Sequence, residues 1–274
     1  MPRSWQYALV FTVLAGHPAP ADVDDEWRFH YTQAQQAIAN RDYAKAESFC
    51  IRAMREAELF GKDDVRVAST SDALGVALRH EKKLVDAEDA IRRAVDIYSF
   101  NPGEGSIEFA QAQFDLAGVL IDEGKYQPAL QSVTLLLPIF DRNLEPSDNK
   151  LAAALCMQGD AYRLLKKYAN AEAPLRRCAE IQTNSGDGDS PEFAEAANSL
   201  ALVLERLGKN AEADRYFTSA EKSLEKSLGL LSPELADTLE AHAALLHQLG
   251  RDAEAKPKER MAAVIRSHSS KPQR

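Results

Sequence analysis

Apolar residues along the chain recur at the three- and four-residue spacing of an α-helix. Two stretches show this clearly, with Leu116, Leu120 and Ile121 in one and Leu200, Val203 and Leu204 in the other. Residues at this spacing share one helix face, which is buried against another element. Polar breaks follow both stretches, so the pattern predicts a series of amphipathic helices separated by tight turns.

The turns repeat with a fixed composition. In Gly124-Lys125-Tyr126, a flexible break is followed by a basic and an aromatic residue, and an alanine comes three residues after the aromatic. The equivalent alanines, separated once by 41 residues and then by 42, are Ala46, Ala87, Ala129, Ala171, Ala213 and Ala255. A period held over six units indicates a repeat protein.

A small residue precedes each of these alanines by twelve positions. This set of marker residues is Ala34, Gly75, Ala117, Gly159, Ala201 and Ala243. Apolar residues at helical spacing lie between each marker and the turn, so each unit is predicted to be a helix, a tight turn and a second helix. Such units bury their apolar faces against their neighbours and form one continuous core.

The units resemble tetratricopeptide repeats, in which leucine and then glycine or alanine stand in the first helix and an alanine follows a Gly-x-Tyr turn. They are roughly eight residues longer than the usual 34, as in the long-repeat subclass of kinesin light chains. The resemblance implies an all-α, right-handed superhelical solenoid of about six helix-turn-helix repeats across residues 22–267. The approximate repeats are 24–62, 63–104, 105–146, 147–188, 189–230 and 231–267, followed by a flexible basic tail at 268–274.

The charge balance narrows the range of partners. The 274 residues carry a formal net charge of −9. Nucleic-acid binding needs a basic surface that neutralises phosphates, so no nucleic-acid partner is expected. The apolar run from Trp5 to Gly16 is too short to cross a bilayer, and no membrane span is expected.

Residues 1–21 have two interpretations. A short basic start, an apolar run and Ala19-Pro20-Ala21 have the order of a secretory signal peptide with its cleavage site. Cleavage there would make the protein exported, to the periplasm or outside the cell. The alternative is a helix that caps the first repeat, and the expected location is then cytoplasmic.

Three places depart from the regular pattern. His80-Glu81-Lys82-Lys83-Leu84 lacks the glycine and the tyrosine, which leaves this turn less determined. Pro138 falls inside a predicted helix and is expected to kink or shorten it, because proline has no backbone N–H. The segment from Arg266 to Arg274 is polar and basic and is expected to fray.

Candidate chemistry is sparse. Cys50, Cys156 and Cys178 lie in predicted helices and are interpreted as packed small hydrophobes, with a disulfide as the alternative. His242 and His247 are five apart, off a common helix face, so they are interpreted as ordinary helix residues. No phosphate loop, nucleophile elbow or metal motif is present, so no cofactor, metal or enzymatic activity is expected.

The best candidate site is the surface lined by the first helix of each unit. Such a surface is concave in a superhelical stack, and in tetratricopeptide-repeat proteins it commonly takes a peptide or helix of another protein. Inward-pointing positions lie three before, one after and four after each marker. The candidate contacts among them are Tyr31, Gln35, Asp72, Arg79, Phe114, Asp160, Arg163, Asn198 and Glu205.

Within this set, Tyr31 and Phe114 are candidate apolar anchors, and Arg79 and Arg163 are candidate contacts to acidic groups of a partner. We therefore expect a non-catalytic scaffold that binds a partner protein or peptide in the concave groove. The alternative is a structural component of the cell envelope that self-associates.

Overall fold

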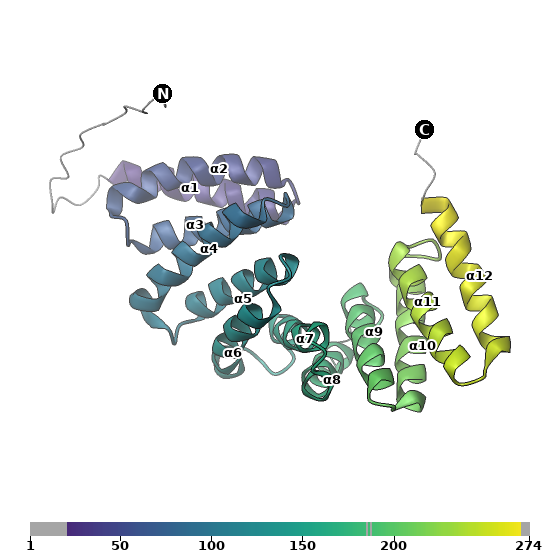
Figure 1. The fold of residues 1–274 in the computed structure, drawn as a ribbon. Helices are drawn as coiled ribbons and strands as arrows, with labels where there is room; N and C mark the ends of the chain where they lie inside the picture. The colour runs from purple at the N-terminus through teal and green to yellow at the C-terminus, as the bar shows by residue number, and fades with distance from the viewer. Residues whose placement is uncertain (1–20, 185, 187, 270–274) are drawn as a thin grey trace, which may run out of the picture.

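The computed structural model describes residues 21–184, 186 and 188–269, which form twelve α-helices and no strand (Figure 1). The helices follow one another in six antiparallel pairs. Their bounds are α1 Ala21–Ala39, α2 Tyr43–Ala57, α3 Val65–His80, α4 Leu84–Tyr98, α5 Ile107–Asp122, α6 Tyr126–Asn143, α7 Asn149–Leu164, α8 Tyr168–Asn184, α9 Pro191–Arg206, α10 Asn210–Ser227, α11 Pro233–Gln248 and α12 Asp252–Ser269. The prediction of an all-α solenoid of paired helices is confirmed.

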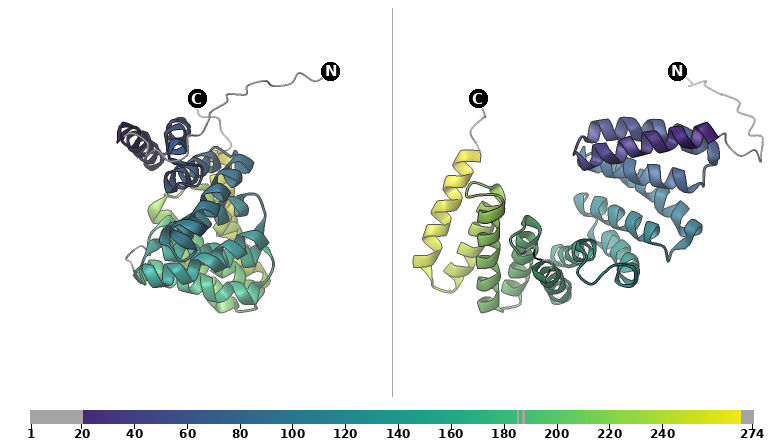
Figure 2. Two further views of the ribbon diagram at one scale, coloured as in Figure 1. Left: turned by 90° about the vertical axis from the view of Figure 1, so that its left-hand side faces the viewer. Right: turned by 180° about the vertical axis from the view of Figure 1, so that it is seen from behind.

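The pairs stack side by side into an open arc (Figures 1 and 2). From α3 to α9, each odd-numbered helix packs against its own partner, against the preceding even-numbered helix and against the next odd-numbered helix. The odd-numbered helices from α5 to α11 lie on the inner side of the arc, and their even-numbered partners lie outside (Figure 1). From the third unit onward, the first helix of each unit therefore lines the inner face.

Side-chain caps fix where the inner helices begin. Ser106, Ser190 and Ser232 each precede an inner helix, and each hydroxyl accepts a hydrogen bond from the backbone N–H three residues later. Asp64 and Asp148 cap α3 and α7, and each carboxylate accepts a hydrogen bond from the backbone N–H two residues later. An N-cap oxygen satisfies a backbone donor that the helix itself leaves free, so these short polar residues stop one unit and start the next.

The turn within each pair has one conformation in all six units. Its central residue takes a positive φ, from 58° at Arg41 to 76° at Gly124. Lysine occupies this position in the second and fourth units, where Lys82 has φ 63° and Lys166 has φ 59°. The turn at 80–84 thus forms without a glycine, because packing of α3 on α4 holds a backbone conformation that lysine alone disfavours.

The marker residues allow each pair of helices to approach closely. Ala34, Ala117 and Ala201 are fully buried. A Cβ atom added at Gly159 would lie 2.4 Å from Cγ of the buried Leu175 on the facing helix. The small residues are therefore required by the contact between the two helices of a unit.

Two of the later helices extend through positions where an interruption was expected. Helix α6 runs through Pro138 to Asn143 without being shortened. Pro138 lies on the exposed face, where the carbonyl that loses its N–H donor can reach water. Helix α12 continues through Arg266 to Ser269, because Arg266 forms ion pairs with Asp237 and Glu240.

The signal-peptide interpretation of residues 1–21 lies almost wholly outside the described residues, as does the end of the proposed tail at 270–274. Within the described part of the chain, none of the helices has the length and apolarity that a bilayer crossing requires.

Candidate functional site: the inner groove

Two hollows open between the inner helices. The first, of about 290 Å³, lies among α3, α5, α7 and α9 and is lined in part by Arg79, Asp122 and Asp160. The second, of about 410 Å³, lies between α9 and α11 and includes Asn198. Glu192 and Glu195 line both hollows. We call this continuous depression the inner groove.

Arg79 crosses from α3 to α5. Its Nε donates to Oδ2 of Asp122 at 3.0 Å, and its Nη2 lies 3.3 Å from Oδ1 of the same carboxylate. The guanidinium lies over Gly118, where an added Cβ would be 2.3 Å from Nη1. The charge of Arg79 is thus already paired, so an acidic partner would have to displace Asp122 to use it.

Three other predicted contacts are also paired within the chain. Nε of Arg163 donates to Oδ1 of Asp160 at 2.9 Å, one helical turn away. Oε1 of Glu205 accepts from Nε2 of Gln248 at 3.0 Å, which joins α9 to α11. These side chains are half-buried or exposed, so a partner could exchange such bonds at modest cost.

The predicted aromatic anchors pack partly into the protein itself. Tyr31 stacks on Trp27 with ring centroids 5.2 Å apart, and its hydroxyl accepts from Nε2 of Gln35 at 2.8 Å. Phe114 packs against Phe140 at a centroid distance of 6.3 Å. Both anchors are half-buried, so only part of each ring remains for a partner.

Asp72 has a less ordinary environment. Its Oδ1 atom is buried and has no hydrogen-bond partner among the described residues. Burial, together with the neighbouring carboxylate of Asp115 on α5, raises the pKa of Asp72 well above its usual range. Burial also raises the pKa of Asp115 to about 6, against the opposing effects of Gln111, Arg79 and Lys150.

Asp115 was missed by sequence analysis. It lies two residues before the marker Ala117, whereas the positions expected to point inward are three before, one after and four after. In the sequence, the position of Asp115 next to the candidate Phe114 was the one signal of a role on the inner face. Asp115 comes near Asp72 because α5 approaches α3 in the fold.

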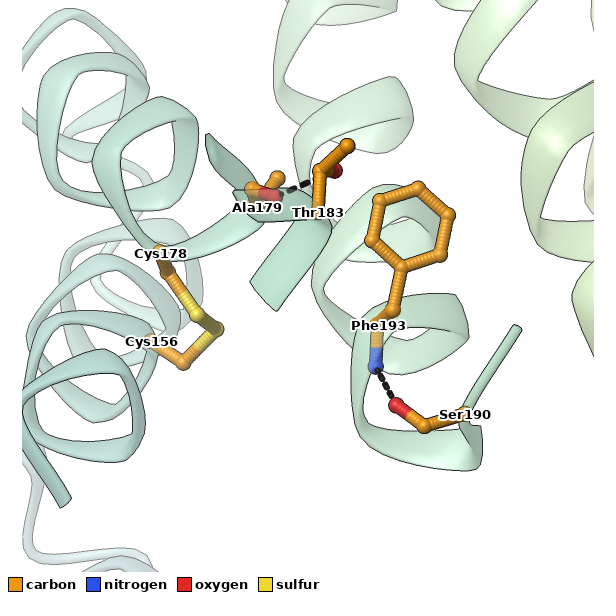
Figure 3. Close-up of a disulfide and its surroundings, with 6 residues drawn as sticks. All are labelled: Cys156, Cys178, Ala179, Thr183, Ser190 and Phe193. Atoms are coloured by element: carbon orange, nitrogen blue, oxygen red, sulfur yellow. Dashed lines mark hydrogen bonds between the residues drawn. A yellow bond between two sulfur atoms is a disulfide. The ribbon is translucent and has the colours of Figure 1, made fainter. Parts of the chain in front are cut away.

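A disulfide joins the two helices of the fourth unit (Figure 3). Cys156 on α7 and Cys178 on α8 are bonded, with their Cα atoms 5.5 Å apart. The interpretation of these two residues as packed thiols was therefore wrong, because the turn between α7 and α8 places positions 22 residues apart face to face. Cys156 lines the inner groove. Cys50 is a buried free thiol, as predicted, and burial raises its pKa to about 12.

His242 is a further correction. It is only 2% exposed, and its two ring nitrogens each lie 2.7 Å from a carboxylate, Nδ1 from Glu221 and Nε2 from Asp214. In the last unit, Lys258 forms an ion pair with Glu221, and Arg251 forms one with Asp214. These contacts connect α10, α11 and α12 and have a structural role. The positions of the five residues in the sequence gave no sign that they would meet.

The charged groups show no geometry for metal binding. Across the described residues, no three His, Cys, Asp or Glu side chains are grouped closely enough to hold a metal ion. His247 instead has Asp252 at 2.6 Å and Glu259 at 3.0 Å, and these contacts raise the pKa of His247.

Comparison with known proteins identifies the type of repeat. Residues 152–185, which contain most of α7 and α8, match the model of the tetratricopeptide repeat. The fold is a tetratricopeptide-repeat solenoid. No curated protein sequence matches the chain.

Solved structures share this tetratricopeptide-repeat fold at low sequence identity. PilW, a type IV pilus biogenesis factor, superposes with a TM-score of 0.66 at 17% identity, covering 90% of this chain and 95% of PilW. A Podosopora anserina kinesin light chain with TPR-like repeats superposes with a TM-score of 0.60 at 16% identity, covering 73% of this chain and 95% of the kinesin light chain structure. A Rap protein complexed with Competence and Sporulation Factor superposes with a TM-score of 0.58 at 20% identity, covering 89% of this chain and 75% of the Rap protein.

Proposed function

We propose that this protein is a non-catalytic scaffold that binds a segment of a partner protein in its inner groove. Two of the buried oxygens without a hydrogen-bond partner among the described residues carry the proposal, Oδ1 of Asn198, which lines the inner groove, and Oδ1 of Asp72 on α3. They occupy the same position in the second and fifth units, three residues before the marker. A buried acceptor without a donor is unfavourable by about 1–3 kcal/mol, which a bound partner can recover.

The comparisons support the proposal at the level of the fold. The Rap structure holds a tetratricopeptide-repeat-like protein in complex with Competence and Sporulation Factor. Fold likeness does not define a partner, so the proposal for this chain depends on its own groove.

Site-specific photo-crosslinking in the native cell tests the proposal. A photoreactive amino acid is placed at Ile121 or Ala153, which line the inner groove, or at the exposed Arg215 on α10 as the matched outer position. We expect both inner positions to give an adduct with the same protein and the outer position to give none. Equal adducts at all three positions would contradict binding in the groove.

Self-association is the second candidate function. Leu228, Leu230 and Leu231 near the connection between α10 and α11 are 44–56% exposed and offer an apolar surface to a second copy. Adducts containing two copies of the chain, with a mass in solution that rises with concentration, would favour this alternative over the scaffold.

Export is part of the proposal. Disulfides persist in oxidising compartments, so the Cys156–Cys178 bond supports the secretory interpretation of the apolar start. The protein recovered for crosslinking gives the test, because export predicts a mature amino terminus at Asp22. An intact Met1 would contradict export and leave the scaffold proposal standing.

A further inference from the structure

The charged side chains that line the inner groove are mainly acidic. The carboxylates on its two hollows are Asp122, Asp160, Glu192, Glu195, Glu234 and Asp237. Arg79 is the one basic side chain among the residues that line them, and it is paired with Asp122. The groove therefore carries excess negative charge, which favours a cationic occupant.

Most of these carboxylates have a role within the fold. Asp160 is paired with Arg163, and Asp237 with Arg266. Glu192 and Glu234 lie in the first turns of α9 and α11, where the helix dipole favours a negative charge.

Glu195 has no such role. It lies beyond the first turn of α9 and forms no ion pair within the described part of the chain. Partial desolvation raises its pKa, and the carboxylates of Asp160 and Glu192 raise it further. The charge of Arg163, which is already paired with Asp160, opposes this effect in part. The remaining repulsion among the acids is unfavourable in the free protein, and a bound cation relieves it.

Asn198 lies one helical turn after Glu195, and so on the same face of α9. Its buried Oδ1 has no hydrogen-bond donor among the described residues. Leu224, which is buried, and Leu228, which is 44% exposed, line the same hollow. The hollow thus combines an unpaired carboxylate, an unpaired amide oxygen and an apolar wall.

We propose that the hollow between α9 and α11 takes a lysine or arginine side chain from a basic segment of the partner. The aliphatic stem packs on Leu224 and Leu228, while the charged end donates to Oδ1 of Asn198 and faces Glu195. This inference rests on the proposed scaffold function. A metal ion suits the site less well, because the acids are dispersed and no three of them converge.

Binding of a labelled peptide of alternating alanine and lysine, followed by fluorescence anisotropy at low salt, tests the inference. We expect Glu195→Gln to weaken binding at least fivefold and Asn198→Leu at least threefold. Glu180→Gln on the outer face of α8 removes the same charge and is expected to change binding less than twofold. A peptide with glutamate in place of lysine is expected not to bind.

Equal weakening by Glu195→Gln and Glu180→Gln would overturn the inference, because it would show attraction to net charge alone. Circular dichroism and thermal unfolding show whether each variant is folded. If native crosslinking captures a partner on inner positions while the peptide result is negative, the basic-segment inference fails and the scaffold survives. If inner positions capture nothing, the proposed function itself fails.

Discussion

At the scale of single residues, the inner face contains groups that the fold does not satisfy. Asp72 and Asp115 approach each other across α3 and α5, and each has a raised pKa. Two carboxylates in a partly desolvated place resist ionising together. Such pairs lower the stability of the free protein, which is a common cost at binding sites.

Replacing one acid of this pair should stabilise the protein in a pH-dependent way. The pKa of Asp115 is about 6 when folded and near 3.8 when unfolded, so the folded state holds the proton more tightly. The contribution of Asp115 to the free energy of unfolding of the wild-type protein is therefore fully present below about pH 4 and is lost as the pH rises through about 6. Asp115→Asn should raise the free energy of unfolding by about 1–2 kcal/mol at pH 7.5 and by little at pH 4.

Urea unfolding at pH 4, 6 and 7.5 measures the effect, with the exposed Asp96 changed to Asn as the control. If Asp115→Asn raised the free energy of unfolding equally at all three pH values, that result would contradict the raised pKa of Asp115.

At the scale of helices, the marker residues decide how closely the two helices of a unit pack. At Gly159 an added Cβ would meet Cγ and Cδ2 of the buried Leu175 at 2.4 and 2.8 Å, so α7 and α8 would have to separate. At Gly118 the nearest atoms belong to the guanidinium of Arg79, which is the mobile end of a long side chain. The same substitution therefore has different consequences in the two helices.

Gly159→Ala should lower the free energy of unfolding by about 1–2 kcal/mol, because overpacking outweighs the better helix propensity of alanine. Gly118→Ala should be neutral or stabilising by up to about 1 kcal/mol, because only Arg79 has to move. Chemical denaturation of the two variants under one condition measures the difference. Equal destabilisation would contradict the distinction between contact with a buried, packed leucine and contact with the mobile end of an arginine.

The disulfide belongs to the same scale. It ties α7 to α8 within one unit and leaves the contacts between units unchanged. It therefore holds the helix carrying Asp160 in place at the centre of the inner groove.

At the scale of the whole molecule, stability is expected to be local because each pair contacts mainly its neighbours. The last unit is held by more than apolar packing. His242 bridges Asp214 and Glu221, while Arg251 and Lys258 from the last unit bind the same carboxylates. Each ring nitrogen of His242 thus faces a carboxylate.

His242→Leu should loosen this end of the solenoid. It leaves two partly buried carboxylates without their shared donor, at a cost of about 2–4 kcal/mol. Hydrogen exchange should show faster exchange in α11 and α12, while α1 to α6 keep their protection. Lys256→Ala, at an exposed position on α12, is the control. Faster exchange spread evenly over all twelve helices would contradict local stability and indicate one cooperative unit.

The sequence alone determined the architecture. Marker and turn positions recur every 41 or 42 residues, and a helical pair buries its face only by stacking on similar pairs, so the all-α solenoid follows from local pattern. The inner positions also follow from this period. Two of them, Asp72 and Asn198, carry the unpaired oxygens on which the proposed function depends.

Only the tertiary structure decided which side chains meet. Cys156 pairs with Cys178, Asp115 approaches Asp72, and His242 is enclosed by acids, because helices distant in sequence are brought together by turns and crossing angles. A one-dimensional pattern specifies the face on which a residue lies, but contacts across faces depend on how the helices are placed in space.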